Sequence, residues 1–123
     1  LLTISALTAC PEARIPVEAS TMATEGLRDL MATMEKIKEG LNPALHPLAI
    51  VPSRVAERRA IDVETVDSMR RHYPRLTTRG VIHECAALKE AAAQQQTIQQ
   101  WAPGKRADVE FSALAAAIMR RAA

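Results

Sequence analysis

Aromatic residues are nearly absent from this sequence of 123 residues, which has one tyrosine, one tryptophan and one phenylalanine. Proteins that bind single-stranded nucleic acid by base stacking need several aromatic faces, so this class is disfavoured. Long apolar runs are absent too, and none approaches the ~18 residues that a membrane-spanning helix needs. We therefore expect no membrane among the partners of the chain.

Glycine and cysteine are also few. The four glycines are isolated, which excludes a Gly-rich phosphate loop or a dinucleotide fingerprint within this sequence. Cys10 and Cys85 lie far apart in the sequence, as in a reduced cytosolic protein. His83 precedes Cys85 by two residues, but a metal site would need a second ligand pair and a nucleophile pair would need an orienting group. We therefore predict no metal ligands and no catalytic residues.

Charge is unevenly distributed along the chain. The net charge is only +2. Between Arg54 and Arg79, however, seven arginines stand against four acidic residues, a local excess of three. Arginine suits contacts to phosphate, so this region is a candidate nucleic-acid surface. The alternative interpretation is a solvated helix face.

Hydrophobic residues make up 48% of the chain, enough for a packed core. Period-two and β-branched patterns predict strands over residues 12–17, 48–51 and 77–82. Helical spacing predicts helices over residues 22–39, 62–73 and 86–95, and a last helix near residue 108. Expected helix ends are Ser20 or Thr21 as the first N-cap, Gly40 as its C-terminal stop, and Asp108 as the cap of the last helix. The buried stripe of that last helix is expected at Val109, Phe111, Leu114, Ala115 and Ile118.

Alternating strands and helices predict an α/β fold with a parallel sheet and flanking helices. Three parallel strands make a thin sheet, because parallel strands are normally covered on both faces and flanked by neighbours. We therefore expect that part of the sheet is missing, and that an exposed apolar edge favours an oligomer. A first residue that is Leu1 rather than Met agrees with a piece of a longer chain.

Several segments in series resemble ParA-type partition ATPases, over essentially all 123 residues and without gaps. Residues 1–9 (LLTISALTA) look like the segment after the second acidic motif of that family, and residues 14–18 (RIPVE) resemble its next core strand. Residues 24–27 (TEGL), 41–45 (LNPAL) and 49–53 (AIVPS) resemble the following helix, loop and strand. Residues 81–82, 88–91 and 101–106 resemble the base-side segment and the C-terminal region.

The resemblance implies the C-terminal half of a deviant Walker P-loop ATPase, as one partial domain over residues 1–123. Such proteins bind ATP with Mg²⁺, form a sandwich dimer and then bind double-stranded DNA without sequence preference. A ParB-type centromere-binding protein stimulates hydrolysis, and the cycle segregates plasmids or chromosomes in the bacterial cytoplasm, on the nucleoid. The lysine loop, the Mg²⁺ ligands and the water-positioning Asp would lie upstream, so this chain alone is expected neither to hydrolyse ATP nor to bind it tightly.

The site residues of the family match this sequence only in part. Candidate contacts to the nucleotide base are Ser53, Ile82, His83 and Glu84, although the family often has Ile-Pro-Arg-Asn where Ile82 is followed by His83, Glu84 and Cys85. Candidate DNA contacts are Arg54, Arg58, Arg59 and Lys89, with Arg58 first. Ala87 stands where the family typically has a DNA-contacting arginine.

Two other hypotheses stay open. These departures favour a non-enzymatic DNA-binding or interaction domain, from a degenerate or split relative. The chain could also be an unrelated small α/β domain.

Overall fold

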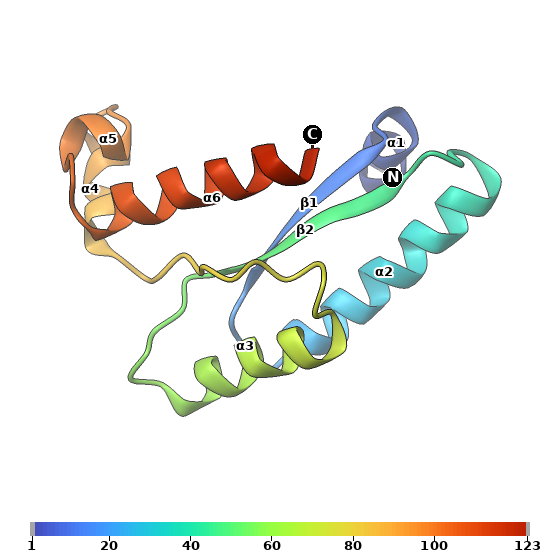
Figure 1. Ribbon diagram of the computed structural model, residues 1–123, viewed down its shortest axis with the longest axis horizontal. Coiled ribbons are helices and arrows are strands. Elements are labelled where there is room, and N and C mark those ends of the chain that lie inside the picture. The colour runs from blue at the N-terminus through green and yellow to red at the C-terminus, as the bar shows by residue number, and fades with distance from the viewer. Residues whose placement is uncertain (1, 123) are drawn as a thin grey trace.

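The computed structural model describes residues 2–122, which form an α/β arrangement (Figure 1). The elements in order are α1 (Leu2–Ala9), β1 (Glu12–Glu18), α2 (Ala23–Gly40), β2 (His46–Ser53), α3 (Ala60–His72), α4 (Ala86–Ala93), α5 (Ile98–Trp101) and α6 (Arg106–Ala122). Strands β1 and β2 pair in parallel, from Glu12 opposite His46 to Glu18 opposite Ser53. Helices α2 and α3 lie on one face of this sheet and α6 lies on the other (Figure 1). The predicted fold class is confirmed.

The third predicted strand, residues 77–82, is only partly formed. Within residues 2–122 it makes two isolated parallel bridges, Thr77 with Ile50 and His83 with Val55. Pro52 of β2 has no N–H to donate, so the pairing breaks at that point. The Thr78 N–H bonds to the Ile50 carbonyl at 2.9 Å, and the next N–H to reach β2 is that of Ile82. Residues 79–81 therefore bulge outward. We call residues 77–83 the edge segment.

Strand β2 is longer than residues 48–51, because prolines do not end it. Pro47 lies opposite Ala13 and Pro52 lies opposite Val17, both inside the paired region. Prolines are tolerated in a strand where no N–H is needed for the ladder. Between the two prolines, Ile50 is fully buried at the centre of the sheet.

The main core lies between the sheet and α2. The predicted stripe of α2 is confirmed by Leu27, Met34 and Ile37, which are all buried. They pack in one cluster with Ile50 and with Met69 from α3. The start of α2 has no side-chain cap, because its N-cap is Met22 and no side-chain hydrogen bond is formed there. The expected cap by Ser20 or Thr21 is wrong.

Other helix ends also differ from expectation. Gly40 is the last residue of α2 rather than the residue after it, and the Leu41 N–H bonds to the Ile37 carbonyl at 2.8 Å. Asp108 lies inside the first turn of α6, where its carboxylate accepts the Gly104 N–H at 2.7 Å. It therefore fixes the preceding turn instead of acting as N-cap.

The buried stripe of α6 is smaller than predicted. Phe111 and Leu114 pack against the core cluster of Ala49, Val51 and Ile82. Val109, however, is 58% exposed, and Ala115 is exposed as well. Helix α6 covers the sheet with one narrow face, because the bulged edge segment leaves no complete third strand for it to pack on.

Helices α1 and α5 were not predicted. The side chain of Asn42 donates to the Leu7 and Cys10 carbonyls at 3.0 and 2.9 Å, which satisfies the C-terminal end of α1 from a distant loop. Helix α5 begins with a capping box between Thr97 and Gln100. No helix among residues 2–122 has the length and apolarity to cross a bilayer.

Candidate functional site

Strand β2 and the edge segment end at the same side of the molecule, where parallel strands present their carboxyl ends. Ser53 is the last residue of β2, and the edge segment reaches the same level at Ile82 and His83. Two hydrogen bonds join them: Val55 N–H to the Ile82 carbonyl at 3.1 Å, and Glu84 N–H to the Val55 carbonyl at 2.9 Å. The four predicted nucleotide-side residues are thus brought together at the edge where open α/β sheets bind ligands.

Their side chains are not equally available. Ile82 is 7% exposed and belongs to the core. The Ser53 hydroxyl donates to the Val51 carbonyl at 3.1 Å, and His83 is held by two carboxylates described below. Glu84 is the most exposed of the four, and it lies beside the loop of residues 54–59, which we call the arginine loop.

Glu84 links two of the predicted DNA contacts. Its carboxylate lies 2.8 Å from the Arg59 guanidinium and 3.8 Å from that of Arg54. Arg54 also lies 3.3 Å from Glu18, and its backbone has a φ of 52°. A positive φ is uncommon for a residue with a side chain, so the chain turns sharply as it leaves β2. Arg54 and Arg59 therefore face carboxylates.

Arg58 and Lys89 differ from this pair. Arg58 is exposed in the loop before α3, and it forms no ion pair with any residue from 2 to 122. Lys89 is exposed on α4, also without an ion pair in that part of the chain. The structure gathers Arg54, Arg58 and Arg59 in one loop, and it places Lys89 on a separate helix.

The arginine loop is anchored by a buried acid. Asp62, in the first turn of α3, is only 2% exposed. Its carboxylate accepts the Ala56 N–H at 2.8 Å and lies 3.2 Å from the Arg59 guanidinium. A carboxylate at the start of a helix also interacts favourably with the helix dipole. Asp62 therefore holds the loop against α3 and leaves Arg58 outside.

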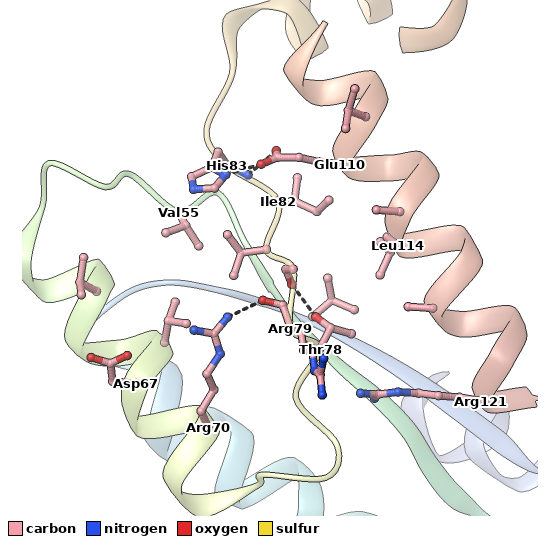
Figure 2. A pocket seen from close by; sticks show the side chains of 18 of the residues that line it. Val55, Asp67, Arg70, Thr78, Arg79, Ile82, His83, Glu110, Leu114 and Arg121 are labelled. Atoms are coloured by element: carbon pink, nitrogen blue, oxygen red, sulfur yellow. Dashed lines mark hydrogen bonds and ion pairs between the residues drawn. The ribbon is translucent and has the colours of Figure 1, made fainter. Parts of the chain in front are cut away.

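His83 lies between two carboxylates from distant elements (Figure 2). Its Nδ1 contacts Glu110 of α6, and its Nε2 lies 2.9 Å from Glu57 of the arginine loop. Its backbone N–H donates to Glu110 at 3.0 Å. Each of the two ring nitrogens therefore faces one carboxylate. His83 thus joins the arginine loop to α6, and its ring does not serve as a partner for Cys85.

Arg106 completes this cluster. Its guanidinium lies 2.6 Å from Glu57 and 3.5 Å from Glu110. The hydrogen bond and the positive charge of Arg106 lower the pKa of Glu57 below its ordinary value. The same hydrogen bond raises the pKa of Arg106. Both groups therefore stay charged across the neutral range.

Sequence reasoning missed Glu57 and Glu110 as parts of this site. Glu110 follows Arg106 by four residues, a spacing at which oppositely charged side chains meet on a helix. This ion pair could therefore have been predicted from the sequence. Glu57 offered no such signal, because its partners are 26 or more residues away.

A cavity of about 850 Å³ lies beside the edge segment, between α3 and α6 (Figure 2). Residues of α3 and α6 form its two walls, and the edge segment forms its floor. None of the predicted DNA contacts lines it, and only Ile82 and His83 of the nucleotide-side residues do.

Comparison with known proteins gives relatives that cover nearly the whole chain. The chain is 32% identical over 120 residues to the chromosome-partitioning ATPase Soj of Thermus thermophilus. The aligned region covers 98% of this chain and 48% of Soj. It matches a C-terminal portion of ParA-type partition ATPases.

Other relatives agree. The chromosome partitioning protein ParA of Caulobacter vibrioides is 29% identical over 91 residues, 74% of this chain and 34% of its own length. The sporulation initiation inhibitor protein Soj of Bacillus subtilis is 27% identical over 106 residues, 86% of this chain and 42% of its own length. The chain spans about half the length, or less, of these ParA-type relatives. No protein-family model matches it.

Proposed function

We propose that this chain is the C-terminal part of a ParA-like partition ATPase, one partial domain over residues 1–123 that acts in ATP-dependent segregation of a plasmid or chromosome. The observation that carries the proposal is the similarity over 98% of the chain to a chromosome-partitioning ATPase. The complete protein would use ATP and Mg²⁺. Its lysine loop and Mg²⁺ ligands would come from a segment that precedes the matched region.

The nucleotide base would lie at the carboxyl edge of the sheet. Ser53 and His83 end the two neighbouring strands there, and Glu84 stands exposed beside them. The backbone of Ile82 and His83 would face the base, because their side chains are buried or held by carboxylates. An acid at Glu84 disfavours contact with phosphates, so its role would be confined to the base side.

Arg58 would be the leading contact to double-stranded DNA. It is exposed and free of carboxylates within residues 2–122, whereas Arg54 and Arg59 would have to leave Glu84 before they reach a phosphate. Lys89 would add a second point of contact from α4. Contacts of this kind read no sequence, and their strength falls steeply with salt.

The complete protein would form a homodimer, respond to a ParB-type centromere-binding protein, and act in the cytoplasm on the nucleoid. The unpaired outer edge of β1, which has no strand partner within residues 2–122, would receive the rest of the sheet.

A second candidate is a non-enzymatic DNA-binding or interaction domain from a degenerate or split relative. The observation that favours it is the Glu57, His83, Arg106 and Glu110 cluster, which occupies polar groups at the edge where a nucleotide would bind. In this case DNA binding would persist while nucleotide had no effect on it.

The test measures binding of the protein to a short fluorescent duplex of random sequence, over a series of KCl concentrations. Replacing Arg58 by Ala should weaken binding and reduce the slope of log affinity against log salt by about 0.9, the value for one phosphate contact. Arg28→Ala on the exposed face of α2 is the matched control, with the same change in charge. Equal slopes for the two variants would show that Arg58 does not contact DNA.

A further inference from the structure

The cavity between α3 and α6 lies beside the edge segment, and we call it the slot (Figure 2). In the sheet plane, β2 already has β1 on one side and the edge segment on the other. The slot lies beyond the edge segment, so whatever enters it would lie next to that segment and between two helices. A space bounded in this way suits one extended chain.

The backbone of the edge segment offers free groups toward the slot. Ile82 donates its N–H to the Pro52 carbonyl and accepts the Val55 N–H with its own carbonyl, while the neighbouring residue Val81 lines the slot. Within residues 2–122 neither group of Val81 has a hydrogen-bond partner, and the Arg79 N–H has none either. An extended peptide that lies opposite Val81 could accept and donate one bond each, which is the minimum pairing of β-augmentation.

Both walls of the slot are apolar. Val63 and Val66 contribute from α3, and Val109, Ala113 and Ala117 contribute from α6. Val63 and Val109 are 43% and 58% exposed, so each of the two helices presents an exposed valine at the slot. A strand with helices on both faces is apolar on both faces. The occupant should therefore carry apolar side chains on successive residues.

Positive charge gathers around the slot. Its lining includes four arginines, Arg70, Arg79, Arg120 and Arg121, against the carboxylates of Asp67 and Glu110. Glu110 is already engaged by His83 and Arg106.

These four arginines have no carboxylate partner among the described residues, and two of them are positioned by the backbone. Arg70 donates to the Arg79 carbonyl at 2.6 Å, and Arg121 donates to the Leu76 carbonyl at 2.5 Å. Figure 2 shows Arg79 and Arg121 at the end of the slot opposite His83 and Glu110. The charge is thus concentrated at one end.

We propose that this slot binds an extended segment of a partner protein, apolar along its length and acidic at the end beside Arg79 and Arg121. Main-chain bonds to Val81 would set its register, and the valines of α3 and α6 would cover its two faces. Carboxylates would pair with guanidinium groups that have no acidic partner in residues 2–122. This site is separate from the arginine loop, and it does not depend on the proposed function.

The test uses fluorescence anisotropy with a labelled acetylated hexapeptide, Asp-Asp-Val-Ile-Val-Thr, and a second peptide with lysine in place of both aspartates. The acidic peptide should bind saturably, and the lysine peptide at least about tenfold more weakly, because its charges face the arginines. Nuclear magnetic resonance should show slower exchange of the Val81 amide when the acidic peptide is present. Equal affinity for the two peptides, or no change at Val81, would overturn the proposal.

Matched variants locate the binding. Ala113→Trp fills the slot from an exposed position on α6 and should abolish binding, whereas Ala116→Trp, on the same helix but outside the slot, should not. Arg120→Glu should weaken binding about tenfold relative to Arg28→Glu. A dimer that Ala113→Trp disrupts, without peptide binding to the parent protein, would assign the slot to a second copy of the chain and refute the proposal.

Discussion

Replacing Glu84 by Gln removes the carboxylate that lies beside both Arg54 and Arg59. Glu84 lies 2.8 Å from Arg59 and 3.8 Å from Arg54. These side chains are about half exposed, so each pair contributes only about 0.2–1 kcal/mol to stability. The substitution should therefore leave the fold intact and remove one of the two carboxylate partners of each guanidinium, while Arg54 keeps Glu18 and Arg59 keeps Asp62.

Loss of the negative charge that Arg54 and Arg59 share should strengthen binding to duplex DNA. If both then contact phosphates, the slope of log affinity against log salt becomes steeper by up to about 1.8, twice the ~0.9 per contact. The assay is anisotropy of a labelled duplex over a series of KCl concentrations. Glu39→Gln, at an exposed position of α2, makes the same change in net charge away from the loop. If Glu84→Gln and Glu39→Gln give the same slope, neither arginine is a DNA contact.

Three further predictions concern stability and ionisation. Ile50→Ala removes a fully buried side chain and should cost about 2–5 kcal/mol in urea unfolding, against less than ~1 kcal/mol for Ile61→Ala, whose side chain is 42% exposed. Asn42→Ala leaves the end of α1 without its side-chain donors, so hydrogen exchange in α1 should speed up while the sheet amides keep their protection. Arg106→Gln should raise the pKa of Glu57 toward its ordinary 4.5, as followed by nuclear magnetic resonance. The pKa of Glu57 is lower in the folded protein than in the unfolded chain, so its ion pair stabilises the protein at a pH above the unfolded-state pKa. This stabilisation is lost as the pH falls through the folded-state pKa. The difference in the free energy of unfolding between parent and variant should therefore shrink in acid.

The elements with a strong local pattern were predictable from the sequence. Helix α2 shows its buried stripe at Leu27, Met34 and Ile37 in the spacing of its apolar residues alone. The predicted strand over residues 48–51 lies within β2 but is too short, because Pro47 and Pro52 suggest strand ends when the sequence is taken without its pairing partner. The pairing with β1 shows that those positions need no N–H on that side of the strand.

Features set by distant contacts could not be predicted. Helix α1 has no amphipathic pattern, and its C-terminal end depends on Asn42, which lies in another loop. The edge segment has β-branched residues typical of a strand, but Pro52 on its neighbour prevents regular pairing. The candidate site shows the same limit: the link between Glu57 and His83 joins segments that only the tertiary fold brings together.

Photolabelling can test whether this chain forms the base side of a nucleotide pocket. The chain would be fused behind the part of Thermus thermophilus Soj that precedes its matched region, and exposed to an ATP analogue that carries an azide on the base. We expect a label on the tryptic peptide from Gly80 to Lys89, and we expect unlabelled ATP to prevent this labelling by competition. A folded fusion protein that binds ATP but carries the label on another peptide would contradict it.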